Sequence, residues 1–261
     1  MKSFYQLLNH EFGTIMRSTL LLSLGMFITP FILMKLRMEQ LGAKYQTFET
    51  VFDTSGSAIA CAAYMIAFVL LMLRSIYSGY RGSKSIYTLL ALPVPRDMIY
   101  WSKLAAFFIG LFMLWASLML SVIINYGSWE ANVEASVMVM EASAQLPMHN
   151  GLFLAVLRSA FLSIVFPLSA KGLLATVSTM VAMITFVFYA VLCERSRRKW
   201  GVVLLVGGWI FLMRGTVVRL NISSNLDQAS MLTMNSIILL LFASLYMWHS
   251  VRLYRAGTIA E

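Results

Sequence analysis

The side chains that most often carry catalysis or bind metals are few in this chain and widely separated. Its three histidines are His10, His149 and His249, and no His-Glu-x-x-His spacing occurs, so the usual zinc site of a metalloprotease is missing. No Gly-x-x-x-x-Gly-Lys-Ser/Thr loop is present to hold ATP phosphates. A serine nucleophile needs a base within hydrogen-bond reach, and the sequence indicates no such pair. We therefore expect no enzymatic activity, metal site or cofactor on this chain.

The composition is that of a membrane protein. Of the 261 residues, 60% are hydrophobic and only 12% are charged, whereas about a quarter of the residues in a soluble domain are charged. A membrane span needs about 20 apolar residues, and six apolar runs reach that length, several of them only with help from flanking residues. These runs are Thr19–Met34, Ala58–Leu73, Leu104–Tyr126, Leu173–Cys193, Trp200–Met213 and Met231–Ser250. The sequence predicts an all-α integral membrane protein with six transmembrane helices, and Trp200–Met213 is the shortest of them.

A seventh apolar segment, 152–169, contains Arg158 in its middle and Pro167 near its end. A charge and a helix breaker at membrane depth are tolerated mainly where protein or water surrounds them. We therefore expect a broken or re-entrant segment at the outer side. The alternative is an ordinary seventh span.

The distribution of Lys and Arg predicts the orientation of the chain. Basic residues cluster between Arg74 and Lys103, again at Arg195–Lys199, and near both ends of the chain, whereas residues 127–150 contain no Lys or Arg and three Glu. Because basic loops stay in the cytoplasm, both termini are expected inside, and residues 127–171 are expected outside as an extracytoplasmic loop with the broken or re-entrant segment. Six crossings satisfy every cluster. We expect a multi-pass protein of the plasma membrane, whose net charge of +9 is matched by anionic lipid headgroups rather than by nucleic acid.

The N-terminal segment 1–17 has its own pattern. Its apolar residues recur at spacings of three and four and are Phe4, Leu7, Leu8, Phe12, Ile15 and Met16. This pattern predicts an amphipathic helix lying on the cytoplasmic membrane surface. A plain helical extension of the first span is the alternative.

The connection 78–103 combines turn, proline and charged residues between two apolar runs. A short amphipathic helix is expected before Pro93, which restricts the residue preceding it to extended conformations. Pro95 fixes a second φ angle. Asp97 is expected in the first turn of the next helix, where the helix dipole favours a carboxylate. The pattern predicts a short helix, a stiff elbow and a new helix; alternatively, the prolines only terminate a helix and the charges only solvate a loop.

The run Leu92-Pro-Val-Pro-Arg96, with Ile99 and Lys103 after it, resembles the second cytoplasmic connection of ATP-binding-cassette (ABC) transporter permeases of the type-2 exporter family. In that family a Leu-Pro-Val/Ile-Ser/Thr-Arg element often precedes an Ile and then a Lys. Pro95 stands here where Ser or Thr is commoner, so hydroxyl capping of the next helix is lost. The layout is also similar to that of the family: an interfacial N-terminal helix, six spans, two cytoplasmic termini and a basic turn before the fifth span, here Arg195–Lys199.

The resemblance implies that this chain is the permease subunit of an ABC exporter. A coupling helix in 78–103 would dock on a separate nucleotide-binding ATPase subunit that carries ATP and Mg, and two permease subunits, identical or different, would pair around a pathway. The implied cargo is an amphipathic peptide, an antibiotic or a lipid. The competing hypothesis is a non-transporting immunity or sensor scaffold in the membrane.

Two groups of residues are the candidate functional sites. On the inner side we expect the first group to dock on the ATPase and to keep the elbow stiff: Arg81, Lys84, Pro93, Pro95, Arg96 and Asp97. On the outer side Arg158 and Lys171 are candidates for holding anionic lipid headgroups or an acidic substrate group; the simpler interpretation is that their long side chains extend to the interface.

Overall fold

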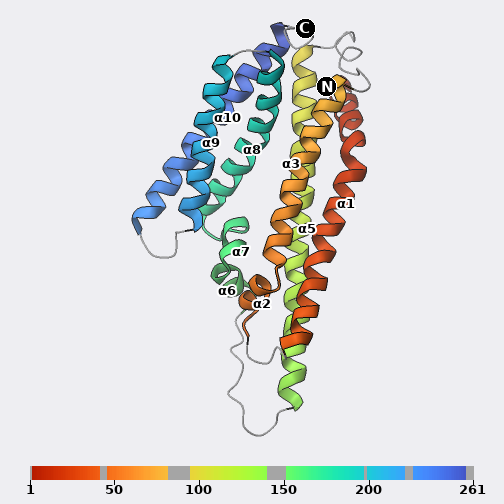
Figure 1. Cartoon of the computed structure of the whole chain (residues 1–261), viewed down its shortest axis with the longest axis vertical. Helices are drawn as coiled ribbons and strands as arrows, with labels where there is room; N and C mark the ends of the chain where they lie inside the picture. Colours follow the sequence, from red (N-terminus) through yellow and green to blue (C-terminus); the bar gives the residue numbers. More distant parts are fainter. Residues whose placement is uncertain are drawn as a thin grey trace. The chain divides into compact units, whose positions relative to one another are not determined.

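The computed structural model describes residues 2–41, 46–81, 95–139, 151–196, 199–220 and 226–256. Within these ranges all regular structure is helical (Figure 1). The long helices are α1 (Lys2–Leu41), α3 (Ser57–Arg81), α5 (Arg96–Val139), α8 (Ala170–Ser196), α9 (Lys199–Leu220) and α10 (Leu226–Ala256). The short helices are α2 (Phe48–Thr54), α6 (Leu152–Arg158) and α7 (Ala160–Val165).

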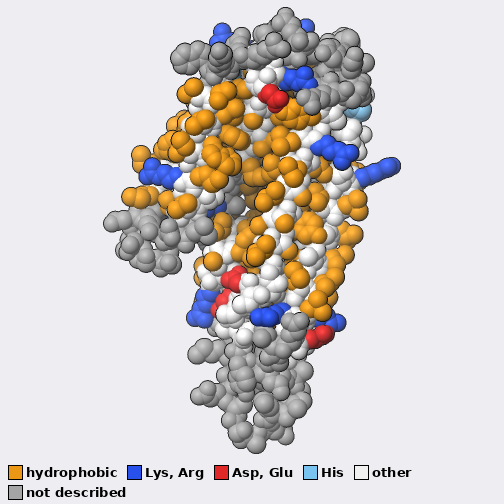
Figure 2. Space-filling view, viewed as in Figure 1, with side chains coloured by type: hydrophobic (Ala, Val, Ile, Leu, Met, Phe, Trp, Pro, Cys, Tyr) orange, Lys and Arg blue, Asp and Glu red, His pale blue; other side chains and the backbone are white. Residues whose placement is uncertain are grey.

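Among the described residues, six helices are long and apolar enough to cross a membrane: α1, α3, α5, α8, α9 and α10. Each contains one of the six apolar runs, so the predicted fold class is confirmed. The shortest of the apolar runs, Trp200–Met213, belongs to α9. The 22 residues of this helix extend about 33 Å at about 1.5 Å per residue. Hydrophobic side chains cover much of the helix surface in Figure 2. Two examples of exposed apolar residues are Leu21 and Val203, whose exposed fractions are 70% and 64%. The chain is a multi-pass membrane protein.

The helices form two compact units. Unit 1 comprises Met1–Arg17, Val69–Leu111 and Ser169–Glu261, and unit 2 comprises Ser18–Phe68 and Phe112–Leu168. The helices α1, α3 and α5 contribute residues to both units.

Unit 1 is built around the contacts that α8, α9 and α10 make with one another. Tyr189 of α8 stacks on Tyr246 of α10 with ring centroids 4.8 Å apart, and the Tyr246 hydroxyl donates to the Leu204 carbonyl of α9 at 2.8 Å. Gly208 leaves the space for this side chain, because a Cβ there would overlap the Tyr246 hydroxyl. Gly208 thus lets α9 and α10 approach each other closely.

Unit 2 is held by hydrogen bonds between helices. Ser121 Oγ of α5 donates to the Phe27 carbonyl of α1 at 3.1 Å, and the hydroxyls of Thr29 in α1 and Tyr64 in α3 lie 2.8 Å apart. Gly25 faces the same tyrosine, since an added Cβ would lie 2.7 Å from its ring. Such small and hydroxyl-bearing residues let helices approach closely where no water is present.

The segment 152–169 is broken, as predicted. The helices α6 and α7 have 7 and 6 residues, which is far below the length of a span. The break is at Ser159, whose extended backbone (ψ 125°) ends α6 and whose side chain accepts from Leu162 N to cap α7. Another tight turn joins α2 to α3 at Gly56, where φ is 78° and a residue without a Cβ is favoured.

In two segments the structure differs from what the sequence pattern predicts. Residues 2–17 are the first turns of α1 and continue into the first span, which is the alternative that the amphipathic pattern left open; a position on the membrane surface stays a prediction. Residues 127–139 extend α5 rather than forming loop. The helix continues because Tyr126, Trp129 and Val133, at spacings of three and four, are buried along one face.

Candidate functional site

The start of α5 is the part of the predicted coupling connection that the structure describes. Pro95 immediately precedes the helix, and its carbonyl accepts the first turn bond from Met98 N at 2.9 Å. Arg96 is the first helical residue, and Asp97 lies in the first turn, as predicted. Pro95 and Arg96 are exposed, whereas Asp97 is partly buried.

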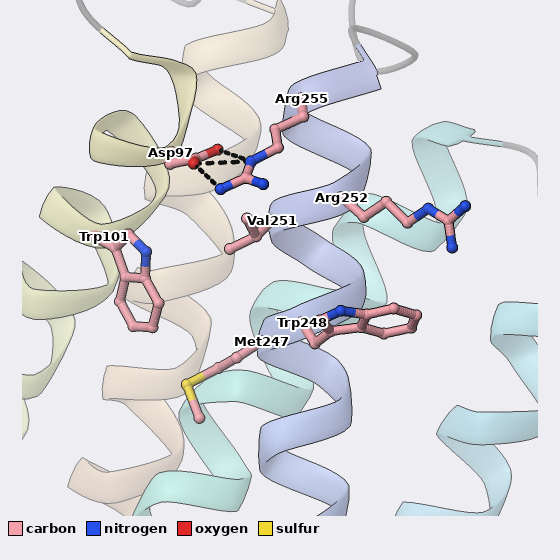
Figure 3. A pocket seen from close by; sticks show the side chains of 7 residues that line it. All are labelled: Asp97, Trp101, Met247, Trp248, Val251, Arg252 and Arg255. Carbon is pink, nitrogen blue, oxygen red and sulfur yellow. Dashed lines mark hydrogen bonds and ion pairs between the residues drawn. The ribbon is translucent and has the colours of Figure 1, made fainter.

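Asp97 is bound by an arginine from the other end of the sequence. Arg255 Nε donates to Oδ1 and Oδ2 of Asp97 at 3.0 and 2.8 Å, and Arg255 Nη2 forms an ion pair with the same carboxylate. Arg96 Nη1 donates to the Arg255 carbonyl at 3.3 Å. We call these three residues the clamp; Figure 3 shows Arg255 of α10 reaching across to Asp97 of α5. The clamp ties the end of the predicted coupling connection directly to the last candidate span.

The two charges of the clamp are placed favourably for the dipoles of their helices, and the clamp is open to water. The carboxylate lies in the first turn of α5 and the guanidinium in the last turn of α10, the positions that the two helix dipoles favour. A bidentate arginine–carboxylate pair also fixes orientation. The Arg255 side chain is 69% exposed, so solvent screens the pair and its contribution to stability is small. Its main effect is to fix the position of the first turn of α5.

Two more polar contacts link helices within unit 1. Lys103 Nζ of α5 lies 3.5 Å from Glu11 Oε2 of α1, and both side chains are less than 10% exposed. Tyr77 of α3 donates a hydrogen bond to Glu194 of α8, and both of these side chains are exposed or partly exposed. Together with the clamp, these contacts join α1 to α5, α5 to α10, and α3 to α8.

Sequence reasoning did not predict these pairings. The partners are distant in the chain, by 158 residues for Asp97 and Arg255, so no local spacing indicates them. A usable signal was the scarcity of acids on the predicted cytoplasmic side. Glu11, Asp97 and Glu194 are almost the only acids among many basic residues there, and the structure gives each of them a partner.

The remaining inner residues are described only in part. Arg81 is the last residue of α3, and its side chain is outside the described part of the structure. Lys84, Pro93 and the expected short helix before Pro93 lie outside the described residues. The structure therefore brings together Arg96 and Asp97 of the predicted docking group, with Pro95 beside them.

At the predicted outer side, the two basic candidates have different surroundings. Arg158 Nη1 of α6 lies 3.9 Å from Glu49 Oε1 of α2, with the arginine side chain 52% exposed. Next to this pair, Ser159 Oγ donates to Asp53 Oδ1 at 3.2 Å. Lys171, in the first turn of α8 of the other unit, is exposed. Arg158 thus has a carboxylate partner in its own unit that the sequence did not indicate.

Partial desolvation raises the pKa of the Asp53 carboxyl above its ordinary value, although the residue as a whole is exposed. The hydrogen bond from Ser159 opposes this rise in pKa, and the nearby charge of Glu49 adds to it. Across the described ranges, no three His, Cys, Asp or Glu side chains are grouped so that they could hold a metal ion. In both units, the polar contacts join helices to one another.

Comparison with protein-family models, with curated proteins and with solved structures found no match to this chain.

Proposed function

We propose that this chain is the membrane-spanning permease subunit of an ATP-driven exporter and that it receives force from a separate ATPase subunit through residues 78–103. The cargo is an amphipathic or hydrophobic molecule such as a peptide, antibiotic or lipid. A second permease subunit completes the pathway. The proposal also places the protein in the plasma membrane with both termini in the cytoplasm.

The clamp carries this proposal. A connection that transmits motion must be joined stiffly to the spans that move, because a flexible joint would absorb the displacement. Asp97 and Arg96 attach the start of α5 to Arg255 in the last turn of α10, so a push on the connection would reach two spans at once. The sequence element Leu92–Arg96 and the six candidate spans add further support.

The second candidate function is a membrane scaffold that binds a peptide without moving it. The broken segment favours this alternative, because α2, α6 and α7 form a small folded region outside the spans. There Phe48 of α2 packs against Tyr126 and Trp129 of α5 at centroid distances of 5.5 and 6.1 Å. A scaffold has no need of an ATPase partner, which makes the two functions separable by experiment.

The test is to express the tagged chain together with the genes that neighbour its own gene and to purify it in mild detergent. Mass spectrometry then identifies the chains that co-purify, and ATP hydrolysis is measured in the same sample. The proposal expects one ATPase subunit in stoichiometric amount and measurable ATP hydrolysis. A homogeneous preparation without any ATPase would overturn the proposal and favour the scaffold.

A further inference from the structure

A groove of about 620 Å³ lies in unit 1 beside the clamp, between α5 and α10. Its apolar lining comes from Trp101, Met247, Trp248 and Val251, and its charged lining comes from Asp97, Arg252 and Arg255. In Figure 3, Trp101 extends from α5 and Met247 from α10 on the same side of the clamp, while Trp248 and Arg252 extend to the other side of α10. The groove is thus apolar within and basic along one edge.

The charges of the groove leave one positive charge uncompensated. Asp97 and Arg255 neutralise each other. Arg252 is exposed, lies over the Trp248 ring at 5.7 Å, and has no acidic partner among the described residues. Arg255 uses Nε and Nη2 for Asp97, and within the described structure its Nη1 has no acceptor. The groove therefore offers the Nη1 donor of Arg255 and the free positive charge of Arg252, three residues earlier in α10, to a ligand with a single negative charge.

The groove lies where two candidate spans end. The span in α5 begins at Arg96, and the span in α10 ends at Arg255. Trp101 and Trp248 lie about one and a half and about two turns farther into these spans and remain 43% and 62% exposed. Exposed indole rings at a span end are typical of the boundary between headgroups and hydrocarbon. A ligand bound here would therefore have its polar part at headgroup level and its apolar part in the bilayer.

We propose that this groove binds one anionic phospholipid. Its phosphate accepts from Nη1 of Arg255, the uncompensated positive charge of Arg252 three residues away adds to the attraction, and its glycerol and upper acyl chain lie against Trp101 and Met247. The volume is within the usual range of about 300 to 1,000 Å³ for small-molecule sites. An acidic segment of a soluble protein would match the charge equally well, but the exposed indoles at the hydrocarbon boundary favour a lipid. The inference is independent of the transport proposal.

The test uses the full-length protein in nanodiscs of phosphatidylcholine. Tryptophan fluorescence is recorded while brominated phosphatidylglycerol, or brominated phosphatidylcholine as the zwitterionic control, is titrated in, because bromine quenches indoles that it contacts. We expect quenching at lower mole fraction with the anionic lipid. Arg252→Gln should weaken this response about fivefold, as one basic side chain near an anionic surface does, and Trp101→Phe should remove part of the signal.

Two control variants keep the test sharp. Arg252→Lys retains the charge and should retain the preference, which excludes a folding defect as the cause of the glutamine result. Arg74→Gln removes an exposed arginine of α3 in the same unit and should leave quenching unchanged. Equal quenching by both lipids, or an equal loss in Arg74→Gln and Arg252→Gln, would overturn the proposal. It would also be overturned if Arg252→Gln released a co-purifying chain and left the lipid preference intact.

Discussion

Asp97, in the first turn of α5, accepts hydrogen bonds at 3.0 and 2.8 Å from Nε of Arg255, in the last turn of α10. The contact joins the N-terminus of one candidate span to the C-terminus of another. Because both partners are close to water, the contact can be altered without disturbing a packed core. This property makes the clamp suitable for separating its effect on coupling from its effect on folding.

Reversing the charges of the clamp tests its role in holding the ATPase subunit. Asp97→Arg and Arg255→Asp should each lower the amount of ATPase that co-purifies, and the double variant should recover part of it, since it restores an ion pair. The recovery should be incomplete because both charges then oppose their helix dipoles. The midpoint of thermal unfolding should change little in all three variants. An additive loss in the double variant would show that the pairing itself has no role.

The buried pair of Glu11 and Lys103 should matter for folding. Lys103→Gln leaves a carboxylate that is less than 10% exposed without its partner, and breaking a buried ion pair costs about 3 to 5 kcal/mol. The double variant Glu11→Leu with Lys103→Met should recover most of this loss, because apolar residues of similar size can replace a buried pair. Unfolding in detergent with increasing denaturant gives the comparison. A single variant as stable as the native protein would show that the pair is not buried in the folded protein.

Neighbouring glycines of α9 provide a matched pair for packing. Gly208→Ala should destabilise unit 1 by about 1 to 3 kcal/mol through overpacking, because its Cβ would overlap the Tyr246 hydroxyl. Gly207→Ala should be neutral or slightly stabilising, since its Cβ would lie 3.5 Å from Phe242 and alanine favours a helix. Adding Tyr246→Phe to Gly208→Ala should recover part of the stability. Equal midpoints of thermal unfolding for the two alanine variants would contradict this packing.

Asp53 should make unit 2 less stable as the pH rises through the acidic range. Its pKa is raised in the folded protein, so the folded state holds the proton more tightly than the unfolded chain does. Stability is therefore lost as the pH rises from the ordinary carboxyl pKa through the raised one. Asp53→Asn should reduce this dependence and keep an oxygen to accept from Ser159. Unfolding midpoints of Asp53→Asn and of the unsubstituted protein are compared between about pH 3.5 and 7. The same dependence of the midpoint on pH in both proteins would contradict the account.

The long elements of this protein could be predicted from composition because hydrocarbon imposes a simple rule on sequence. A span must be apolar over its whole length, so all six candidate spans were visible, and Arg158 with Pro167 marked the broken segment. The start of α5 was also visible, because Pro95 and Asp97 are local signals. The extension of α5 to Val139 was missed, since its acidic residues obscured a buried face formed by Trp129 and Val133.

The pairings within the site could not be predicted in the same way. Asp97 with Arg255, and Glu11 with Lys103, depend on which helices pack together, and no periodicity within one helix contains that information. The contacts of Tyr246 with Gly208 and of Tyr64 with Gly25 likewise join residues of different helices. Local signals thus located the elements, whereas contacts between helices required the structure.

The central claim, that the start of α5 contacts a separate ATPase, is tested most directly by site-specific cross-linking in membranes. A cysteine-reactive photo-cross-linker is attached to Arg96→Cys. The control is Arg214→Cys, because Arg214 is exposed and lies toward the C-terminal end of α9. The native Cys61 and Cys193 are buried and should not react. The account predicts a cross-linked band containing the ATPase subunit for Arg96→Cys and none for Arg214→Cys. No band from Arg96→Cys, or equal bands from both positions, would contradict it.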